Sequence, residues 1–217
     1  MDLTRAIDIY CERIDTAFWA EPVNAVTNLA FILAALYGWR LAAKRGDLGP
    51  AVIVLVVLAA AVGTGSFLFH TYAQAWAGMA DVIPIGLFSM AFAFVSIRRF
   101  FGFSAIQAGA AVLAIIGAFY LAWATAGLPR VGGSTLYSPA VIYLGAMAAL
   151  LLGLRHPAAW TMTAAVAIFS ASLYFRGLDG RICADFPLGT HFLWHIFNGL
   201  LFAFLLRAVI VHRTDRP

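Results

Sequence analysis

The stretch AVIVLVVLAAAVGTGSFLFH, residues 51–70, decides the fold class, because it contains no Asp, Glu, Lys or Arg. As an α-helix, a run of about 20 residues spans the roughly 30 Å apolar core of a lipid bilayer. The whole chain has the same character: 63% of its 217 residues are hydrophobic, 11% are charged, and the mean hydropathy is +0.91. A water-soluble protein of this length needs more polar residues on its surface. The composition therefore indicates a membrane protein and disfavours disordered, collagen-like, cysteine-scaffold and nucleic-acid-binding classes.

Further apolar stretches of similar length predict an all-α, polytopic bundle of seven transmembrane helices. The expected spans are residues 22–41, 51–70, 79–97, 105–124, 138–154, 158–175 and 191–210. Because the connections between them are short, we expect residues 1–217 to form a single domain. Residues 1–21 are expected to form a segment outside the membrane, and residues 211–217 a tail. The N-terminal segment is acidic and lacks the features of a cleaved signal peptide, so we expect it to remain in the protein.

The charges in the loops predict the orientation, because Lys and Arg gather on the cytoplasmic side of membrane proteins. Nine of the 14 Lys and Arg residues fall on the side of the C-terminus. The N-terminus is therefore predicted to lie outside, in a periplasm or organelle lumen, and the C-terminal tail in the cytosol. The short loops favour a bacterial inner membrane, with a membrane of the ER or Golgi type as the alternative. No nucleic-acid partner and no obligate protein partner are expected.

Polar side chains from three spans are predicted to meet near the outer end of the bundle. His70 ends the second span, Asp81 lies near the start of the third, and His191 begins the seventh. His195 follows His191 by four residues, which places both imidazoles on one helix face at a spacing that can chelate a metal ion. Ser66 precedes His70 by the same interval and can offer a hydroxyl to the same place.

Three neutral imidazoles suit Zn²⁺, whose fourth tetrahedral position stays open to water in catalytic sites. Manganese or ferrous iron is chemically possible as well. The alternative is a set of hydrogen-bonded structural histidines. Asp81 needs a partner in apolar surroundings and could accept a proton during catalysis or act as a charge at a helix N-terminus. Ser66 could equally bond to the backbone of its own helix.

The two cysteines, Cys11 and Cys183, both lie outside in the predicted topology. This is an oxidising location where a disulfide persists, so we predict a bridge between the N-terminal segment and the loop before the last helix. The alternative is a pair of free thiols.

Six motifs distributed along the chain form a specific combination. They are Tyr10-Cys11-Glu12, Glu21-Pro22-Val23-Asn24, residues 63–70 (GTGSFLFH), Asp81, residues 179–183 (DGRIC) and residues 191–195 (HFLWH). Together they resemble the alkaline ceramidases, part of a superfamily of seven-helix membrane proteins that includes the adiponectin and progestin receptors. The resemblance covers nearly the whole chain. It implies an intramembrane zinc amidase that cleaves the N-acyl bond of ceramide or a related N-acyl lipid to a sphingoid base and a fatty acid.

The resemblance also assigns roles to the site residues. His70, His191 and His195 match the zinc ligands of the family. Asp81 matches the residue that accepts a proton from the attacking water and passes it to the leaving amine. Ser66 matches the residue that stabilises the tetrahedral oxyanion.

A calcium site in the N-terminal segment is a further implication of the resemblance. Its oxygen donors would be the carboxylates of Glu12, Glu21 and Asp15 and the backbone carbonyl of Tyr10. Such hard oxygen donors are the ligands that Ca²⁺ prefers. Ile9 and Ile14 stand where the family pattern has Asp and Asn. The alternative is a group of acidic residues on a solvated outer face.

Two other classes of function compete with the hydrolase. One is a receptor-like or scaffold protein that holds zinc for structure and has little turnover. The other is a proton-coupled transporter that uses Asp81 and the histidines as a relay. Cleavage of an N-acyl lipid that depends on the metal distinguishes the hydrolase from both.

Overall fold

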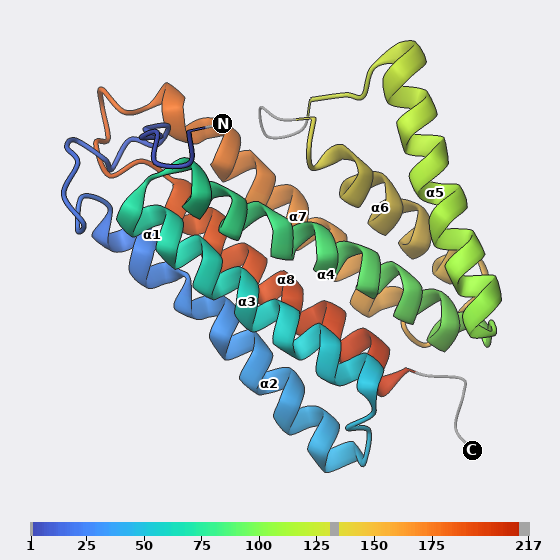
Figure 1. Ribbon diagram of the computed structural model, residues 1–217. Coiled ribbons are helices and arrows are strands. Elements are labelled where there is room, and N and C mark those ends of the chain that lie inside the picture. The colour runs from blue at the N-terminus through green and yellow to red at the C-terminus, as the bar shows by residue number, and fades with distance from the viewer. Residues whose placement is uncertain (1, 131–134, 213–217) are drawn as a thin grey trace.

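The computed structural model describes residues 2–130 and 135–212, and within these ranges the regular secondary structure is helical (Figure 1). The elements are α1 (Pro22–Thr27), α2 (Leu29–Arg45), α3 (Pro50–Tyr72), α4 (Ala75–Phe101), α5 (Ala105–Ala126), α6 (Ser138–Gly153), α7 (Ala159–Leu178), a 3₁₀ turn (Asp179–Arg181) and α8 (His191–Val211). The prediction of an all-α, polytopic membrane protein is confirmed.

Each of the seven expected spans contains a helix. The first consists of α1 and α2, which follow one another at Asn28 and together cover Pro22–Arg45. Six of the spans in the described chain are long and apolar enough to cross a bilayer, and α6, with 16 residues, is shorter. The side of the membrane that each end faces stays a prediction. Residues 213–217 of the predicted cytosolic tail lie outside the described residues.

Tight turns with specific end residues join the helices opposite the N-terminal segment. The chain leaves α2 through Gly46, whose φ of 63° is one that glycine adopts without strain, and enters α3 at Pro50, a favoured first helical residue. Ser104 begins α5 with a capping box in which Ser104 and Gln107 satisfy each other's backbone N–H groups. These signals keep neighbouring helices antiparallel.

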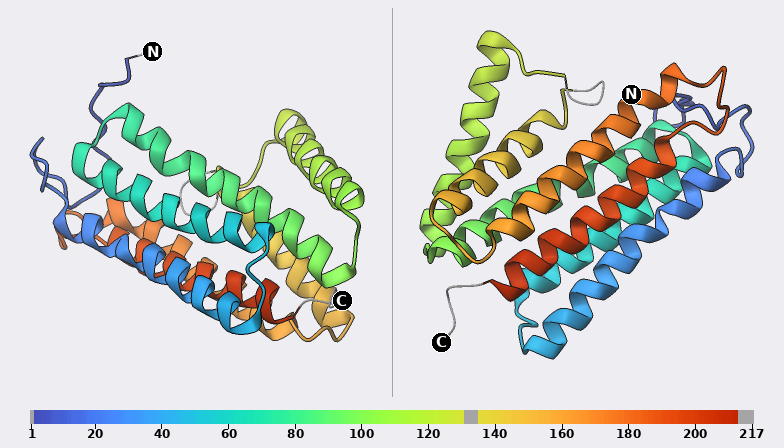
Figure 2. Two further views of the ribbon diagram at one scale, coloured as in Figure 1. Left: turned by 60° about the horizontal axis from the view of Figure 1, so that its bottom comes forward. Right: turned by 180° about the vertical axis from the view of Figure 1, so that it is seen from behind.

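The helices pack in chain order, with α8 returning to the middle of the bundle. Helix α3 lies between α2 and α4, while α8 packs on α2 and α7 and also contacts α3 and α4. Helix α5 stands at the edge beside α4 and leans away from the other helices (Figures 1 and 2). Within α5 only Ala108 is fully buried, and the face opposite its contacts with the core is exposed. The return of α8 brings its first turn beside the last turn of α3.

Two glycines allow neighbouring helices to approach closely near the candidate site residues predicted from the sequence. A Cβ atom on Gly65 of α3 would lie 1.9 Å from the carbonyl oxygen of Ala80 in α4. A Cβ atom on Gly199 of α8 would lie 2.5 Å from the Cβ of Ala30 in α2. Real Cβ atoms do not approach other atoms so closely, and glycine is therefore the residue that permits both crossings.

We call the end of the bundle that residues 2–21 cover the capped end. There the backbone N–H of Ile7 donates to the carbonyl of Ala73, and the N–H of Ala75 donates to the carbonyl of Arg5, so the segment is joined to the α3–α4 turn. The predicted disulfide between Cys11 and Cys183 is confirmed, and it ties the segment to the loop before α8. The N-terminal segment is thereby fixed over the first turn of α8.

Candidate metal centre

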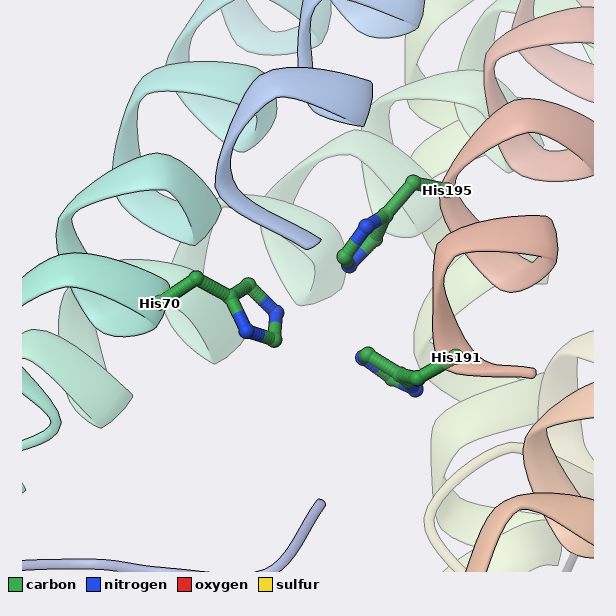
Figure 3. A group of neighbouring side chains, drawn as sticks. All are labelled: His70, His191 and His195. Atoms are coloured by element: carbon green, nitrogen blue, oxygen red, sulfur yellow. The ribbon is translucent and has the colours of Figure 1, made fainter. Parts of the chain in front are cut away.

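Three histidines from two helices converge at the capped end (Figure 3). His70 lies in the last turn of α3, and His191 and His195 lie in the first turns of α8. The ring centroids are 5.1 Å apart for His70 and His191, 4.7 Å for His70 and His195, and 4.6 Å for His191 and His195. One ring nitrogen from each lies within 4.8 Å of the other two. All three side chains are buried.

Two of the rings are oriented by hydrogen bonds through their Nδ1 atoms. His70 Nδ1 lies 2.6 Å from Oε2 of Glu21, and His195 Nδ1 lies 3.0 Å from the hydroxyl of Thr27. Each bond fixes the ring and leaves Nε2 directed away from the partner. Such outer partners hold metal-binding histidines in the required tautomer and raise their basicity.

Each of the three rings has a buried nitrogen for which the described part of the chain provides no hydrogen-bond partner. These atoms are Nε2 of His70, Nδ1 of His191 and Nε2 of His195. An unpaired polar atom away from water costs free energy, and three at one point are rare in a folded protein. Three neutral imidazole donors are a ligand set typical of catalytic Zn²⁺, which binds them at about 2.0–2.1 Å. The residues therefore fit a metal ion of this kind.

Asp81 and Ser66 lie together beside the histidines. The Ser66 hydroxyl and His70 are both near enough to the Asp81 carboxylate to interact with its charge. Ser66 and Asp81 are the residues that follow Gly65 and Ala80, where α3 and α4 touch. The glycine contact thus brings together the turns of α3 and α4 that carry Ser66 and Asp81.

The acidic residues of the N-terminal segment have separate partners. Glu12 accepts hydrogen bonds from the backbone N–H groups of Val23 and Asn24 at the start of α1, at 2.7 and 2.8 Å. Asp15 is exposed and accepts the N–H of Ala17. Among the described residues, the three histidines are the group of His, Cys, Asp and Glu side chains near enough to share an ion, and Glu12, Asp15 and Glu21 do not form another. Calcium stays a prediction.

Glu21 belongs to the histidine cluster. Besides His70, it contacts Arg13, whose Nε donates to Oε1 at 2.6 Å, and Asn24, whose Nδ2 donates to Oε2 at 3.1 Å. Burial alone would raise the pKa of Glu21, but His70, Arg13 and Asn24 outweigh it and hold the pKa below its ordinary value. The carboxylate is therefore ionised and can accept a hydrogen bond from the Nδ1–H group of His70.

The N-terminal segment and the loop before α8 also position His191. The ring of Tyr10 stacks on the ring of His191, with centroids 3.6 Å apart. Buried Asp179 accepts the backbone N–H groups of Thr190 and His191 at 2.6 and 2.9 Å, and that of Cys11 at 3.1 Å. A carboxylate at this place accepts hydrogen bonds from N–H groups at the N-terminus of α8, and its negative charge interacts favourably with the positive end of the helix dipole.

An apolar cavity leads from Ser66 and Asp81 into the bundle. Phe88 of α4, Phe119 of α5 and Leu144 of α6 are among the residues that line it. Further lining residues come from α2, α3, α7 and α8, so every helix from α2 to α8 borders the cavity. The cavity lining is mostly hydrophobic, and Ser66 and Asp81 are among its few polar groups.

Sequence reasoning missed the contacts of Arg13 and Thr27 and assigned Glu21 elsewhere. Glu21 and Thr27 lie at the two ends of the short helix α1, so the sequence shows that they are near each other. Their positions in the sequence do not indicate that they contact His70 or His195. Only the packing of α1 against α3 and α8 brings these residues together. Arg13 is followed by residues with no regular pattern, and no sequence signal points to its partners.

The fold and the site together define a multi-pass membrane protein with a buried cluster of three histidines that could hold a metal ion, beside an apolar cavity. A comparison with known protein families gives a match to the Ceramidase family over residues 5–216, and the chain belongs to this family. No curated protein matches the sequence. Membership implies a hydrolase that acts on the amide bond of ceramide, and therefore a lipid substrate.

Proposed function

We propose that this protein is a zinc-dependent ceramidase that cleaves the N-acyl bond of ceramide or a related N-acyl lipid to a sphingoid base and a fatty acid. The observation that carries the proposal is the set of three buried ring nitrogens of His70, His191 and His195 without a hydrogen-bond partner in the described chain, close to Asp81 of an apolar cavity. Zn²⁺ held there would act as a Lewis acid and would lower the pKa of water at its open position.

Asp81 is the proton carrier in this proposal. Its carboxylate lines the cavity beside His70, where it can accept a proton from the water that attacks the amide carbonyl carbon. The attack forms a C–O bond and a tetrahedral oxyanion. Asp81 then gives the proton to the amide nitrogen as the C–N bond breaks, so that the amine leaves neutral and the carboxylic acid remains.

Ser66 stabilises the oxyanion. Its hydroxyl is near the Asp81 carboxylate, which needs a donor while it is ionised. When Asp81 has taken the proton from water, that need is smaller, and the hydroxyl can turn to the negative oxygen. A positioned donor in a site that excludes water adds a few kcal/mol of transition-state stabilisation.

The apolar cavity accommodates hydrocarbon chains of the substrate. Phe88, Phe119 and Leu144 lie deeper in the bundle than Asp81, so a chain lying against them places its amide at the site. We further propose that the capped end faces the outside and the C-terminus the cytosol, in a bacterial inner membrane or a membrane of the ER or Golgi type.

Protein purified in detergent tests the proposal through metal analysis and an N-acyl lipid screen. Cleavage that is lost after chelation and restored by zinc supports it. Metal retained without cleavage of any N-acyl lipid would favour the receptor-like alternative, and solute flux without bound metal would favour the transporter. His191→Ala is expected to lose metal and activity. Asp81→Asn is expected to keep metal and lose activity by about 10²–10⁴, and His212→Ala, at the far end of α8, is the matched control.

A further inference from the structure

Arg13 is a buried arginine at the capped end whose guanidinium is surrounded by oxygen atoms. Nε donates to Oε1 of Glu21 at 2.6 Å, and Nη2 donates to the backbone carbonyl of His70 at 3.0 Å. Nη1 donates to the carbonyls of Asp15 and Ala17 at 3.1 and 3.4 Å. The side chain is 4% exposed, so these contacts are made out of bulk water.

The oxygens come from three parts of the chain, and Arg13 contacts all three of them. Asp15 and Ala17 lie in the loop before α1, Glu21 lies at the start of α1, and His70 ends α3. One carboxylate and three carbonyls are the types of oxygen donor that a hard cation such as Ca²⁺ takes in proteins. In this chain the guanidinium already contacts these oxygens with its own positive charge.

The carboxylates that a calcium ion would need are engaged in other contacts. Both oxygens of Glu21 are hydrogen-bonded, one to Arg13 and the other to His70 and Asn24. Both oxygens of Glu12 accept backbone N–H groups at the start of α1. A divalent ion beside the guanidinium would face like charge in a buried place, where such repulsion is poorly screened. The residues of the N-terminal segment therefore do not fit a calcium ion.

We infer that the guanidinium of Arg13 is the built-in cation of the capped end, and that the protein binds no calcium there. Arg13 is then a positioning residue. It holds the Glu21 carboxylate in line with Nδ1 of His70 and joins the loop of Asp15 and Ala17 to the end of α3. The inference concerns how the metal centre is supported, and it holds whichever lipid is the substrate.

The planar shape of the guanidinium explains why arginine suits this position. Its N–H groups are fixed in one plane and reach oxygens on several sides at once, whereas the lysine ammonium is a point charge on a flexible chain. Arg13→Lys keeps the charge beside Glu21 but loses most of the carbonyl contacts, and Arg13→Gln loses the charge as well. The two variants thus separate the charge from the geometry.

Calcium binding by the wild-type protein is the first test, and it needs no variant. The zinc-loaded protein in detergent is freed of calcium, dialysed against millimolar CaCl₂ and assayed for bound calcium, and its thermal unfolding is followed with and without CaCl₂. We expect no stoichiometric calcium and an unchanged Tm. One bound calcium per chain together with a rise in Tm would overturn the inference.

Zinc retention in the Arg13 variants is the second test. Competition with a zinc-binding dye is expected to show roughly tenfold weaker zinc binding in Arg13→Gln, as for other losses of an outer partner of a metal ligand, and a smaller loss in Arg13→Lys. The control is Arg181→Gln, an exposed arginine at the same end of the bundle. Zinc binding by Arg13→Gln that equals that of the control would refute the positioning role. If Arg13→Gln does not fold, Arg13→Lys is compared with the control in the same way.

Discussion

Replacement of Gly65 by alanine tests whether the contact between α3 and α4 sets the geometry of catalysis. The new Cβ atom would lie 1.9 Å from the carbonyl oxygen of Ala80, whereas an ordinary contact begins at 3.4 Å. The helices must therefore separate by about 1.5 Å at this point, because the obstructing oxygen belongs to the backbone of a well-packed helix. An O–H···O hydrogen bond has a length of about 2.5–3.0 Å, so an interaction between the Ser66 hydroxyl and the nearby Asp81 carboxylate does not survive a shift of this size.

We expect Gly65→Ala to fold, to bind zinc and to cleave N-acyl lipid about 10²-fold more slowly, since a misplacement near 1 Å costs that much. The assay measures released fatty acid from the detergent-purified variant, together with its zinc content. Gly86→Ala is the matched control, because a Cβ atom on Gly86 in α4 meets nothing within 4 Å. A rate for Gly65→Ala equal to that of Gly86→Ala would refute the reasoning.

Three further substitutions test the support of the site and of the opposite end of the bundle. Thr27→Val removes the hydrogen bond to His195 Nδ1 and should weaken zinc binding by about tenfold in a competition titration; unchanged affinity would show that Thr27 does not orient the ring. Asp179→Asn should lower the free energy of unfolding by about 1.5–3 kcal/mol, because one hydrogen bond to a charged acceptor is lost. Chemical unfolding measures this change, and an unaltered free energy of unfolding would contradict the prediction. Asp47→Asn leaves Arg99 buried without the carboxylate that now lies 2.9 Å from its Nη2, and should cost about 3–5 kcal/mol without changing zinc content; loss of zinc in this variant would contradict the separation of the two ends.

The spans of the bundle could be predicted because each is a long apolar run, and composition alone reveals such runs. The predicted starts of the second and fourth spans lie close to the starts of α3 and α5. Pro50 and the capping box of Ser104 and Gln107 are local signals for the start of a helix there. The pairing of helices was not predictable from these patterns. Lipid-facing and buried positions are both apolar here, so the sequence of α5 does not indicate that this helix stands at the edge.

The histidine cluster could be anticipated because its members share a depth in the membrane and two of them lie four residues apart on one helix. The partners of the cluster follow from tertiary packing. The family resemblance placed Glu21 in a calcium site, and in the structure its carboxylate contacts His70 and Arg13. An arginine in an irregular segment has no periodicity from which its partners could be inferred, and Thr27 resembles any hydroxyl in a membrane helix.

The covalent link between residues 11 and 183, which are 172 positions apart, has a consequence for biosynthesis. His70 enters the membrane early in translation, but the other two imidazoles enter with the last helix. The histidine cluster is therefore completed only when synthesis is nearly finished, and the disulfide, which needs residue 183, then fixes the first residues of the chain over it. A ribosome-bound intermediate accordingly has no assembled site, and lipid hydrolysis begins only with the mature protein.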